Sequence, residues 1–236
     1  MPDFMVMILA NEAEESQLPP PETKALVEGH SAYARKLREA GAYLDGERLR
    51  PSTEGKRVSA RDGQPRVEAG PFGETALEGY YLLQAQSLEA AIELAKQCPM
   101  SPGTTLDVRP LMKGRLKPEK AGQQGRVFAL AVLGSAANEQ GWVEIMDRID
   151  NETVSNFPTA RFLGGVRLLA PGTGRQVRTS QGGQRAVFDG PFLEGKEVIG
   201  GLFFIHLSTL EEAVNWAGQT VAVKYGALEI RELWRS

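Results

Sequence analysis

The chain has 236 residues, with 26 Gly, 14 Pro and a formal net charge of −3, which excludes a collagen-like, strongly charged or compositionally disordered protein. Its 42% hydrophobic content can bury a core, and a single cysteine, Cys98, excludes an internal disulfide. No stretch reaches about 20 apolar residues and no basic leader precedes the first apolar run. We therefore expect a cytoplasmic protein without a membrane segment, and the acidic balance gives no reason to expect nucleic-acid binding.

The first half of the chain predicts strands and helices in alternation. Apolar residues 4–9 predict a buried strand, and after three prolines the stripe within residues 26–37 predicts a helix that Gly41 ends. Four further elements follow in order: a strand from residue 43, a hairpin around residues 58–67, an aromatic strand at 79–83 and a helix at 88–95. Residues 106–111 predict the last strand.

The second half repeats this order. Ala69-Gly70-Pro71-Phe72 returns 120 residues later as Asp189-Gly190-Pro191-Phe192. The blocks around it return in the same order: residues 46–49 as 165–168, 79–83 as 201–205, and 106–111 as 228–233. The sequence thus predicts two homologous domains, 1–113 and 126–236, joined by a polar linker at 114–125.

The order of elements in each half indicates a fold class. A β-α-β, hairpin, β-α-β order is typical of the split β-α-β, ferredoxin-like α+β unit. The prediction is an α+β protein made of two tandem ferredoxin-like domains, each with an inserted β-hairpin.

Each half also resembles the YCII-related, DGPF-type domain family. The family has a Gly-Gly-Glu-x-Leu strand, an Asp-Gly-Pro-Phe turn, a Gly-Gly-aromatic strand and a final Glu-x-Arg-Pro strand, in this order. Here Ala69 replaces the Asp of the turn in the first copy, and Glu232 replaces the final Pro in the second. The resemblance implies a dimeric α+β barrel, which a tandem chain can form as an intramolecular pseudo-dimer. It leaves a further homodimer open.

The resemblance carries one catalytic pattern. YCII-type relatives have a helix His that faces an Asp placed just before a Pro, after the second helix. In this chain His30 matches the helix His, but Cys98 stands before Pro99. In the second copy Ile149 lies near the position of His30, so any such chemistry is expected in the first copy only.

His30 is the leading candidate for acid-base chemistry, because it lies on the apolar stripe of its helix. A polar group there needs a partner or a cavity. Either His30 is a core residue bonded to backbone or water, or it faces a cleft where Asp45 or Glu47 of the next strand orients it. Asp45 is the second catalytic candidate.

Arginines recur on the strands of both copies: Arg48 with Arg167, and Arg109 with Arg231. A planar guanidinium can bind a carboxylate or phosphate at two points. The alternative is that these arginines brace the scaffold through ion pairs with Glu74, Glu194 or Glu47.

Together these observations give a leading hypothesis and an alternative. The first copy binds a small anionic or aromatic metabolite, with Tyr33, Glu47, Arg48 and Arg109 as ligand-binding candidates beside His30 and Asp45. Cofactor-free isomerase or lyase chemistry would suit this site. The alternative is a non-enzymatic interaction or regulatory module linked to an extracytoplasmic-function sigma factor. No cofactor or metal motif is present, and the sequence leaves open whether the protein is an enzyme.

Overall fold

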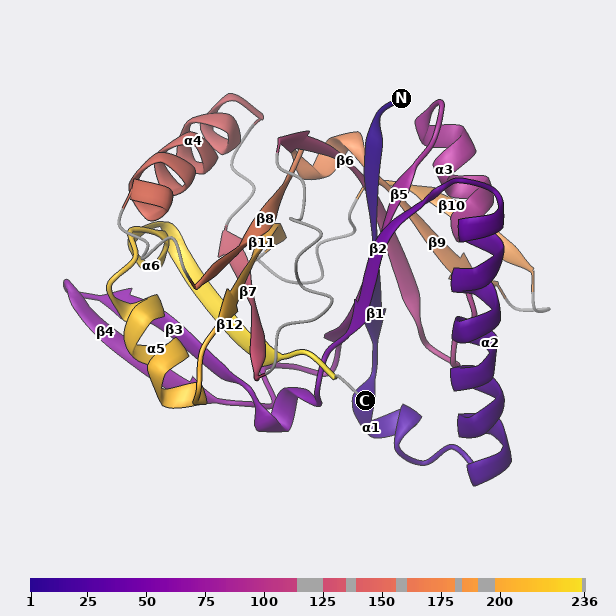
Figure 1. The fold of residues 1–236 in the computed structure, drawn as a ribbon, viewed down its shortest axis with the longest axis horizontal. Coiled ribbons are helices and arrows are strands. Elements are labelled where there is room, and N and C mark those ends of the chain that lie inside the picture. The colour runs from indigo at the N-terminus through magenta and orange to yellow at the C-terminus, as the bar shows by residue number, and fades with distance from the viewer. Residues whose placement is uncertain (114–124, 135–138, 156–160, 181–183, 191–197, 235–236) are drawn as a thin grey trace. The chain divides into compact units, whose positions relative to one another are not determined.

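The computed structural model describes residues 1–113, 125–134, 139–155, 161–180, 184–190 and 198–234 (Figure 1). Most of the predicted linker at 114–125, as well as Pro191, Phe192 and Glu194, lies outside the described residues. The chain divides into two compact units, each an α+β assembly. Unit 1 comprises Met1–Arg48, Gly73–Leu111 and Gly172–Phe192. Unit 2 comprises Leu49–Phe72, Met112–Pro171 and Leu193–Ser236.

Unit 1 has a six-stranded antiparallel sheet in the order β2-β5-β1-β6-β9-β10. Its elements are β1 (Asp3–Ala10), α1 (Glu12–Glu15), α2 (Pro20–Glu39), β2 (Tyr43–Arg48), β5 (Ala76–Gln84), α3 (Leu88–Ala95), β6 (Thr105–Lys113), β9 (Arg175–Thr179) and β10 (Arg185–Asp189). The four strands of the first repeat keep the ferredoxin-like order, with β1 between β5 and β6.

Unit 2 repeats this plan in the order β8-β11-β7-β12-β3-β4. Its elements are a 3₁₀ turn (Ser52–Glu54), β3 (Lys56–Arg61), β4 (Gln64–Ala69), β7 (Val127–Gly134), α4 (Glu139–Ser155), β8 (Phe162–Leu168), a second 3₁₀ turn (Pro171–Thr173), β11 (Val198–His206), α5 (Leu210–Gly218), α6 (Ala222–Tyr225) and β12 (Gly226–Glu232). The predicted fold class, with a hairpin inserted in each repeat, is confirmed.

The two hairpins are exchanged between the repeats, which the sequence does not predict. Strand β3 of the first repeat pairs with β12 of the second, and β9 of the second repeat pairs with β6 of the first. Each compact unit is therefore the ferredoxin-like core of one repeat completed by the hairpin of the other.

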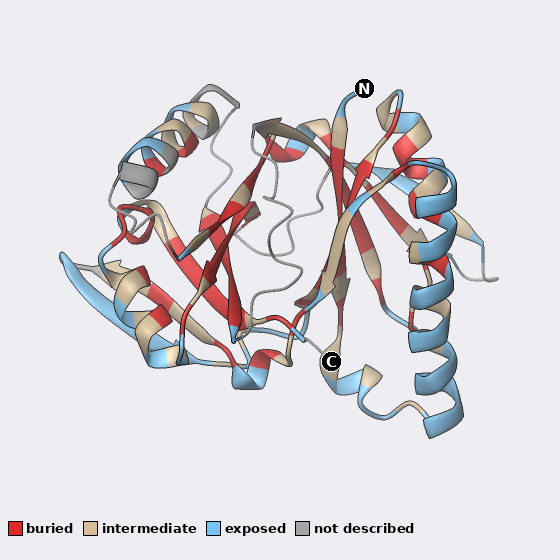
Figure 2. Ribbon diagram, viewed as in Figure 1, coloured by how far each residue is buried: buried red, intermediate tan, exposed pale blue. Residues whose placement is uncertain are grey.

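In unit 1 the hydrophobic core lies between the sheet and its helices. Alternate residues of β1, such as Val6, pack with Tyr81 of β5 and with Leu37 of α2 in one buried cluster. Figure 2 shows the consequence for α2, which is mostly exposed, while β1 and β5 of the same unit are largely buried. Pro20 begins this helix, where a missing N–H costs nothing, and Gly41 with φ +67° follows its end as predicted.

No helix among the described residues combines the length and the apolar character that a membrane crossing needs.

Candidate functional site

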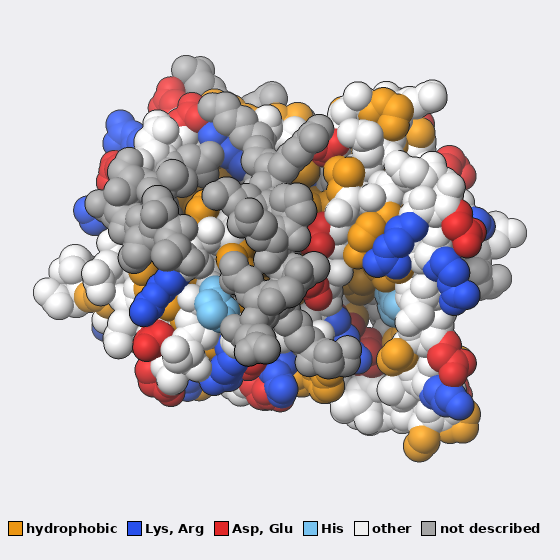
Figure 3. All heavy atoms as spheres, viewed as in Figure 1, with side chains coloured by type: hydrophobic (Ala, Val, Ile, Leu, Met, Phe, Trp, Pro, Cys, Tyr) orange, Lys and Arg blue, Asp and Glu red, His pale blue; other side chains and the backbone are white. Residues whose placement is uncertain are grey.

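A cavity of about 300 Å³ opens in unit 1 between α2 and the strands β2 and β5. One face of α2 lines it at helical spacing, through Thr23, Leu26, His30, Ala34 and Arg38. Figure 3 shows the hollow beside α2, on the right, where hydrophobic, basic and acidic side chains gather. The cavity thus has an apolar wall and charged groups within reach of the same ligand.

The register of β2 and β5 decides which side chains face α2. Gly46 pairs with Tyr81, and Arg48 pairs with Gly79, so these four residues share one face of the sheet. Tyr81 belongs to the core cluster under α2, which identifies this face as the helix side. Gly46 makes room for the ring, because a Cβ there would lie 2.7 Å from Cδ1 of Tyr81.

His30 makes its hydrogen bonds to Tyr81. Its Nδ1 lies 3.0 Å from the Tyr81 hydroxyl oxygen, and the same hydroxyl lies 3.5 Å from the His30 carbonyl oxygen. Burial lowers the pKa of His30 to about 4, with Glu15 acting to raise it and Arg48 to lower it. The imidazole is therefore neutral at pH 7 and acts in the cavity as a hydrogen-bonding group.

Two carboxyl groups meet in the cavity. Glu15, at the end of α1, and Glu78 of β5 both line it, and Glu15 lies close enough to act on the Glu78 carboxyl group. Burial, followed by the hydrogen bond and charge of Glu15, raises the pKa of Glu78 to about 8. Ser101 Oγ donates a hydrogen bond to Glu15 at 3.1 Å, and Nη2 of Arg48 lies 3.8 Å from the other Glu15 oxygen.

Asp45 does not orient His30, contrary to the prediction. Strand β2 has an irregularity between Tyr43 and Asp45: Tyr43 pairs with Leu83 and Asp45 with Leu82, which are consecutive residues. This bulge turns Asp45 to the face opposite α2. There it accepts a hydrogen bond of 2.8 Å from the hydroxyl of Tyr80. Asp45 thus lies on the other side of the sheet from His30.

Glu47 and Tyr33 also differ from their predicted settings. Glu47 borders the cavity but pairs in register with Tyr80, which places it on the same face as Asp45. The buried Tyr33 donates a hydrogen bond of 3.0 Å to the Leu94 carbonyl. Its ring packs edge-on against Tyr81, with the centroids 5.0 Å apart. Tyr33 therefore supports the cavity wall from behind.

Arg109 lies outside the cavity. It pairs in register with Met5, which in turn pairs with Leu82, so Arg109 belongs to the face opposite α2. Its Nε lies 3.3 Å from Oδ2 of Asp107, two residues before it on the same strand. Both side chains are buried. Arg109 was predicted to bind ligand, but this setting fits a bracing ion pair within the sheet.

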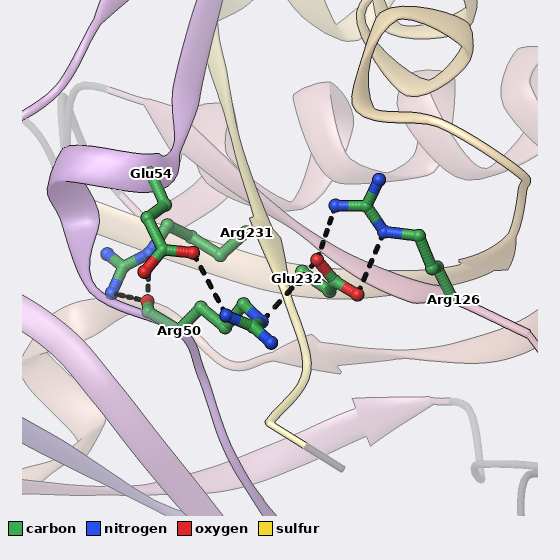
Figure 4. A network of polar contacts seen from close by, with 5 residues as sticks. All are labelled: Arg50, Glu54, Arg126, Arg231 and Glu232. Carbon is green, nitrogen blue, oxygen red and sulfur yellow. Dashed lines mark hydrogen bonds and ion pairs between the residues drawn. The ribbon is translucent and has the colours of Figure 1, made fainter.

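The equivalent arginine of unit 2 is also part of a bracing network (Figure 4). Nε of Arg231 donates to the Arg50 carbonyl oxygen at 2.8 Å, and the Arg231 guanidinium lies 3.1 Å from Glu229. Next to it, Arg126 binds both carboxylate oxygens of Glu232. The partners differ from those predicted: Glu74 is exposed, and Glu194 lies outside the described residues.

Tyr81 and Glu78 of the cavity have apolar equivalents in unit 2. The register places Phe203 opposite Gly165, as Tyr81 lies opposite Gly46, and Gly200 takes the place of Glu78. Arg167 corresponds to Arg48 but is buried, with Asp147 at 2.7 Å and the Val143 carbonyl at 3.0 Å. Unit 2 therefore lacks the carboxyl pair and the tyrosine hydroxyl at the equivalent described positions.

Three residues that shape the cavity were not site candidates in the sequence. The sequence pattern indicates that Tyr81 is an aromatic residue of the hydrophobic core, and Glu15 lies in a polar segment without periodicity. Glu78 does carry a signal, because it is the one acidic residue of the largely apolar strand Ala76–Gln84. An unpaired acid in a buried strand needs a partner, which here is Glu15.

These features define a class of protein: a tandem ferredoxin-like α+β chain in which one unit carries a polar, partly apolar-walled cavity. A family model for the YCII-related domain matches residues 4–113 and 119–236. The chain therefore belongs to the YCII-related domain family, as the sequence motifs predicted. An uncharacterized protein of Rhizobium meliloti (strain 1021) is 32% identical over 112 residues, which covers 46% of this chain and 90% of that protein.

Several solved structures are similar across nearly the whole chain. A provisionally assigned monooxygenase from Fusobacterium nucleatum aligns with a TM-score of 0.48 and 12% identity, over 98% of this chain and 91% of that one. A provisionally assigned chlorite dismutase aligns with a TM-score of 0.45 and 10% identity, over 99% and 94%. A heme-binding protein from Thermus thermophilus aligns at 0.39 and 8%, over 99% and 91%.

Proposed function

We propose that unit 1 binds a small organic anion with an aromatic or apolar body in the cavity between α2 and β2–β5. The observation that carries this proposal is the lining of the cavity. Apolar residues such as Leu26 and Ala34 form one wall, and Arg48 lies among the polar groups. A volume of about 300 Å³ suits a small molecule.

Arg48 is the group that binds the anion. Its side chain is half exposed and lies 3.8 Å from Glu15. A guanidinium offers several N–H donors in one plane, so Arg48 can bind a ligand carboxylate while it stays near Glu15. The proton on Glu78 also matters. Because the pKa of Glu78 is raised to about 8, this group is mostly uncharged at pH 7 and repels an anion less than a carboxylate would.

His30 adds a neutral hydrogen-bonding group. Tyr81 engages its Nδ1, and Nε2 has no hydrogen-bond partner among the residues that the structure describes. A neutral imidazole can hydrogen-bond to a ligand oxygen without the cost of burying a second cation. The site then offers one charge contact and one neutral contact to the polar end of the ligand.

A thermal-shift experiment tests the proposal with 3-phenylpropionate as the probe and its neutral amide as the matched ligand. The anion should raise the Tm of the wild-type protein and the amide should not, because only the anion gains the charge contact. Arg48→Met should abolish the shift. Arg35→Met is the control variant, since Arg35 is exposed on α2 and does not line the cavity. An equal shift by anion and amide, or a shift that survives in Arg48→Met, contradicts the proposal.

We also propose a cytoplasmic location. Cys98 is a buried free thiol, which is compatible with a reducing compartment.

A further inference from the structure

We infer that Glu78 is the proton-transfer residue of the cavity in unit 1, with Glu15 as its positioning partner, and that the substrate is an organic acid with a removable proton on the carbon next to a carbonyl group. This inference rests on the proposed function, because Glu78 would act on the anion that Arg48 binds. It differs from the expectation drawn from the sequence, which gave the acid-base role to His30 and Asp45.

The contacts of Glu15 hold it at the wall of the cavity. Glu15 accepts a hydrogen bond of 3.1 Å from Ser101 and lies 3.8 Å from the Arg48 guanidinium. Ser101 is itself buried and lies 2.7 Å from the hydroxyl of Thr104, so it is held in place. Glu15 lies close enough to Glu78 to raise its pKa, after burial, so Glu78 keeps its proton near neutral pH.

The charged and titratable groups around Glu78 come from three elements. Glu12 and Glu15 of α1 stabilise its protonated form, whereas Arg48 of β2 opposes them. The pKa of Glu78 is raised to about 8, while that of His30, on α2, is lowered to about 4. A group exchanges protons efficiently when its pKa lies near the working pH. Of these two residues, Glu78 meets this condition near neutral pH.

The reaction that this geometry allows consumes no co-reactant. In its ionised form, Glu78 takes the proton from the carbon next to the carbonyl group. The electron pair of the broken C–H bond forms a C=C bond, and the carbonyl π pair moves onto the oxygen to give an enolate. Glu78 then returns the proton to the oxygen or to another carbon of the same molecule, which completes an isomerisation. A neutral imidazole such as His30 can donate a hydrogen bond to the developing oxyanion.

Phenylpyruvate is the probe for this step, because it has a carboxylate, an aromatic ring and exchangeable protons beside a carbonyl group. Exchange of its methylene protons with D₂O, followed by NMR, should be faster with the wild-type protein than in buffer. Glu78→Gln should reduce the added rate by about 100-fold or more. The isosteric neutral Gln should keep both the fold and the Tm shift that phenylpyruvate causes. The control Glu93→Gln changes an exposed carboxylate of α3 and should leave exchange unchanged.

Glu15→Gln tests the positioning role. Removing the negative neighbour should lower the pKa of Glu78, so the pH profile of the exchange rate should move toward lower pH while exchange itself persists. A structural role alone would change the rate at all pH values together. An unshifted profile would therefore exclude Glu15 as the positioning partner.

A carboxyl ¹³C NMR titration of the protein without any ligand separates this inference from the proposed function. Glu78 should titrate near pH 8 in the wild-type protein and lower in Glu15→Gln. A titration near the usual value of glutamate overturns the inference, even if organic anions bind. Exchange that survives in Glu78→Gln overturns it as well, as does bound phenylpyruvate that shows no added exchange. If phenylpyruvate causes no Tm shift, the proposed binding function fails, and the titration still decides on Glu78.

Discussion

The Tyr81 hydroxyl lies 3.0 Å from Nδ1 of His30, and this contact joins strand β5 to helix α2 across the cavity. The rings of the two residues are nearly parallel, at 21°. Phe203, the equivalent of Tyr81 in unit 2, has the same ring without the hydroxyl. At this position of the sheet, one hydroxyl group distinguishes unit 1 from unit 2.

Tyr81→Phe should remove this hydrogen bond and keep the ring packing. We expect a loss of about 1 kcal/mol in the free energy of unfolding, because His30 is left without its partner in a largely buried setting. Urea denaturation at pH 7 measures the change. The control is Tyr225→Phe, whose hydroxyl accepts a hydrogen bond from Arg148 at the surface and whose loss should have little effect. Equal losses in the two variants would argue against a buried His30–Tyr81 contact.

His30 should reduce stability at acid pH. Its pKa is about 4 in the folded protein and 6.5 as the reference value, so between these pH values the unfolded chain binds the extra proton. The contribution of His30 is present above pH 6.5 and is lost as the pH falls through 4, by about 3 kcal/mol in total. Denaturation curves between pH 7 and 4 should show a shallower decline for His30→Asn than for wild type.

Glu78 should reduce the stability of the folded protein as the pH rises. Its folded pKa of about 8 lies above the reference value of 4.5, so the folded protein retains a proton that the unfolded chain has released. Stability from this group is complete below pH 4.5 and is lost as the pH rises through 8. Glu78→Gln cannot ionise, so its stability relative to wild type should increase from about pH 5 to about pH 9. A constant difference across this range would contradict the raised pKa.

Asp45 should matter for stability and not for ligand binding. Asp45→Ala removes the acceptor that lies 2.8 Å from the buried Tyr80 hydroxyl, which should cost about 1–3 kcal/mol. Asp45→Asn retains an acceptor oxygen and should cost less. Because Asp45 lies on the face opposite α2, both variants should keep the Tm shift caused by 3-phenylpropionate. If the well-folded Asp45→Asn variant loses this Tm shift, Asp45 takes part in ligand binding after all.

The repeat made the fold predictable, because a second copy shows which residues belong to each element. The face of the sheet on which Asp45 lies could not be predicted, because it depends on a β-bulge that the sequence pattern does not show. Two-residue alternation places Tyr43 and Asp45 on the same face, which would direct Asp45 toward His30. The bulge between them reverses this, because one extra residue in a strand turns every later side chain to the other face.

The exchange of the hairpins could not be predicted from the sequence for a different reason. The local signals in residues 58–67 correctly indicate two paired strands, and Val58 does pair with Val67. The partner of the outer edge is Leu228, far along the chain, and both candidate partner strands, β6 and β12, have nearly the same sequence pattern. Local propensity cannot choose between two equivalent edges.

A substitution at Gly174 tests how the exchanged hairpin of unit 1 pairs with strand β6. Its backbone passes so close to β6 that a Cβ would lie 2.4 Å from Cγ of Arg109 and 2.9 Å from the Val108 carbonyl oxygen. Gly174→Ala should therefore displace the buried Arg109 and weaken the pairing of β6 with β9, at a cost of about 1–3 kcal/mol. Hydrogen exchange of the Val177 amide, opposite Leu106, should accelerate. Gly172→Ala is the matched control, because a Cβ there has no atom within 4 Å. If the two alanine variants unfold at the same urea concentration, the close approach of Gly174 to Arg109 does not hold the hairpin in place.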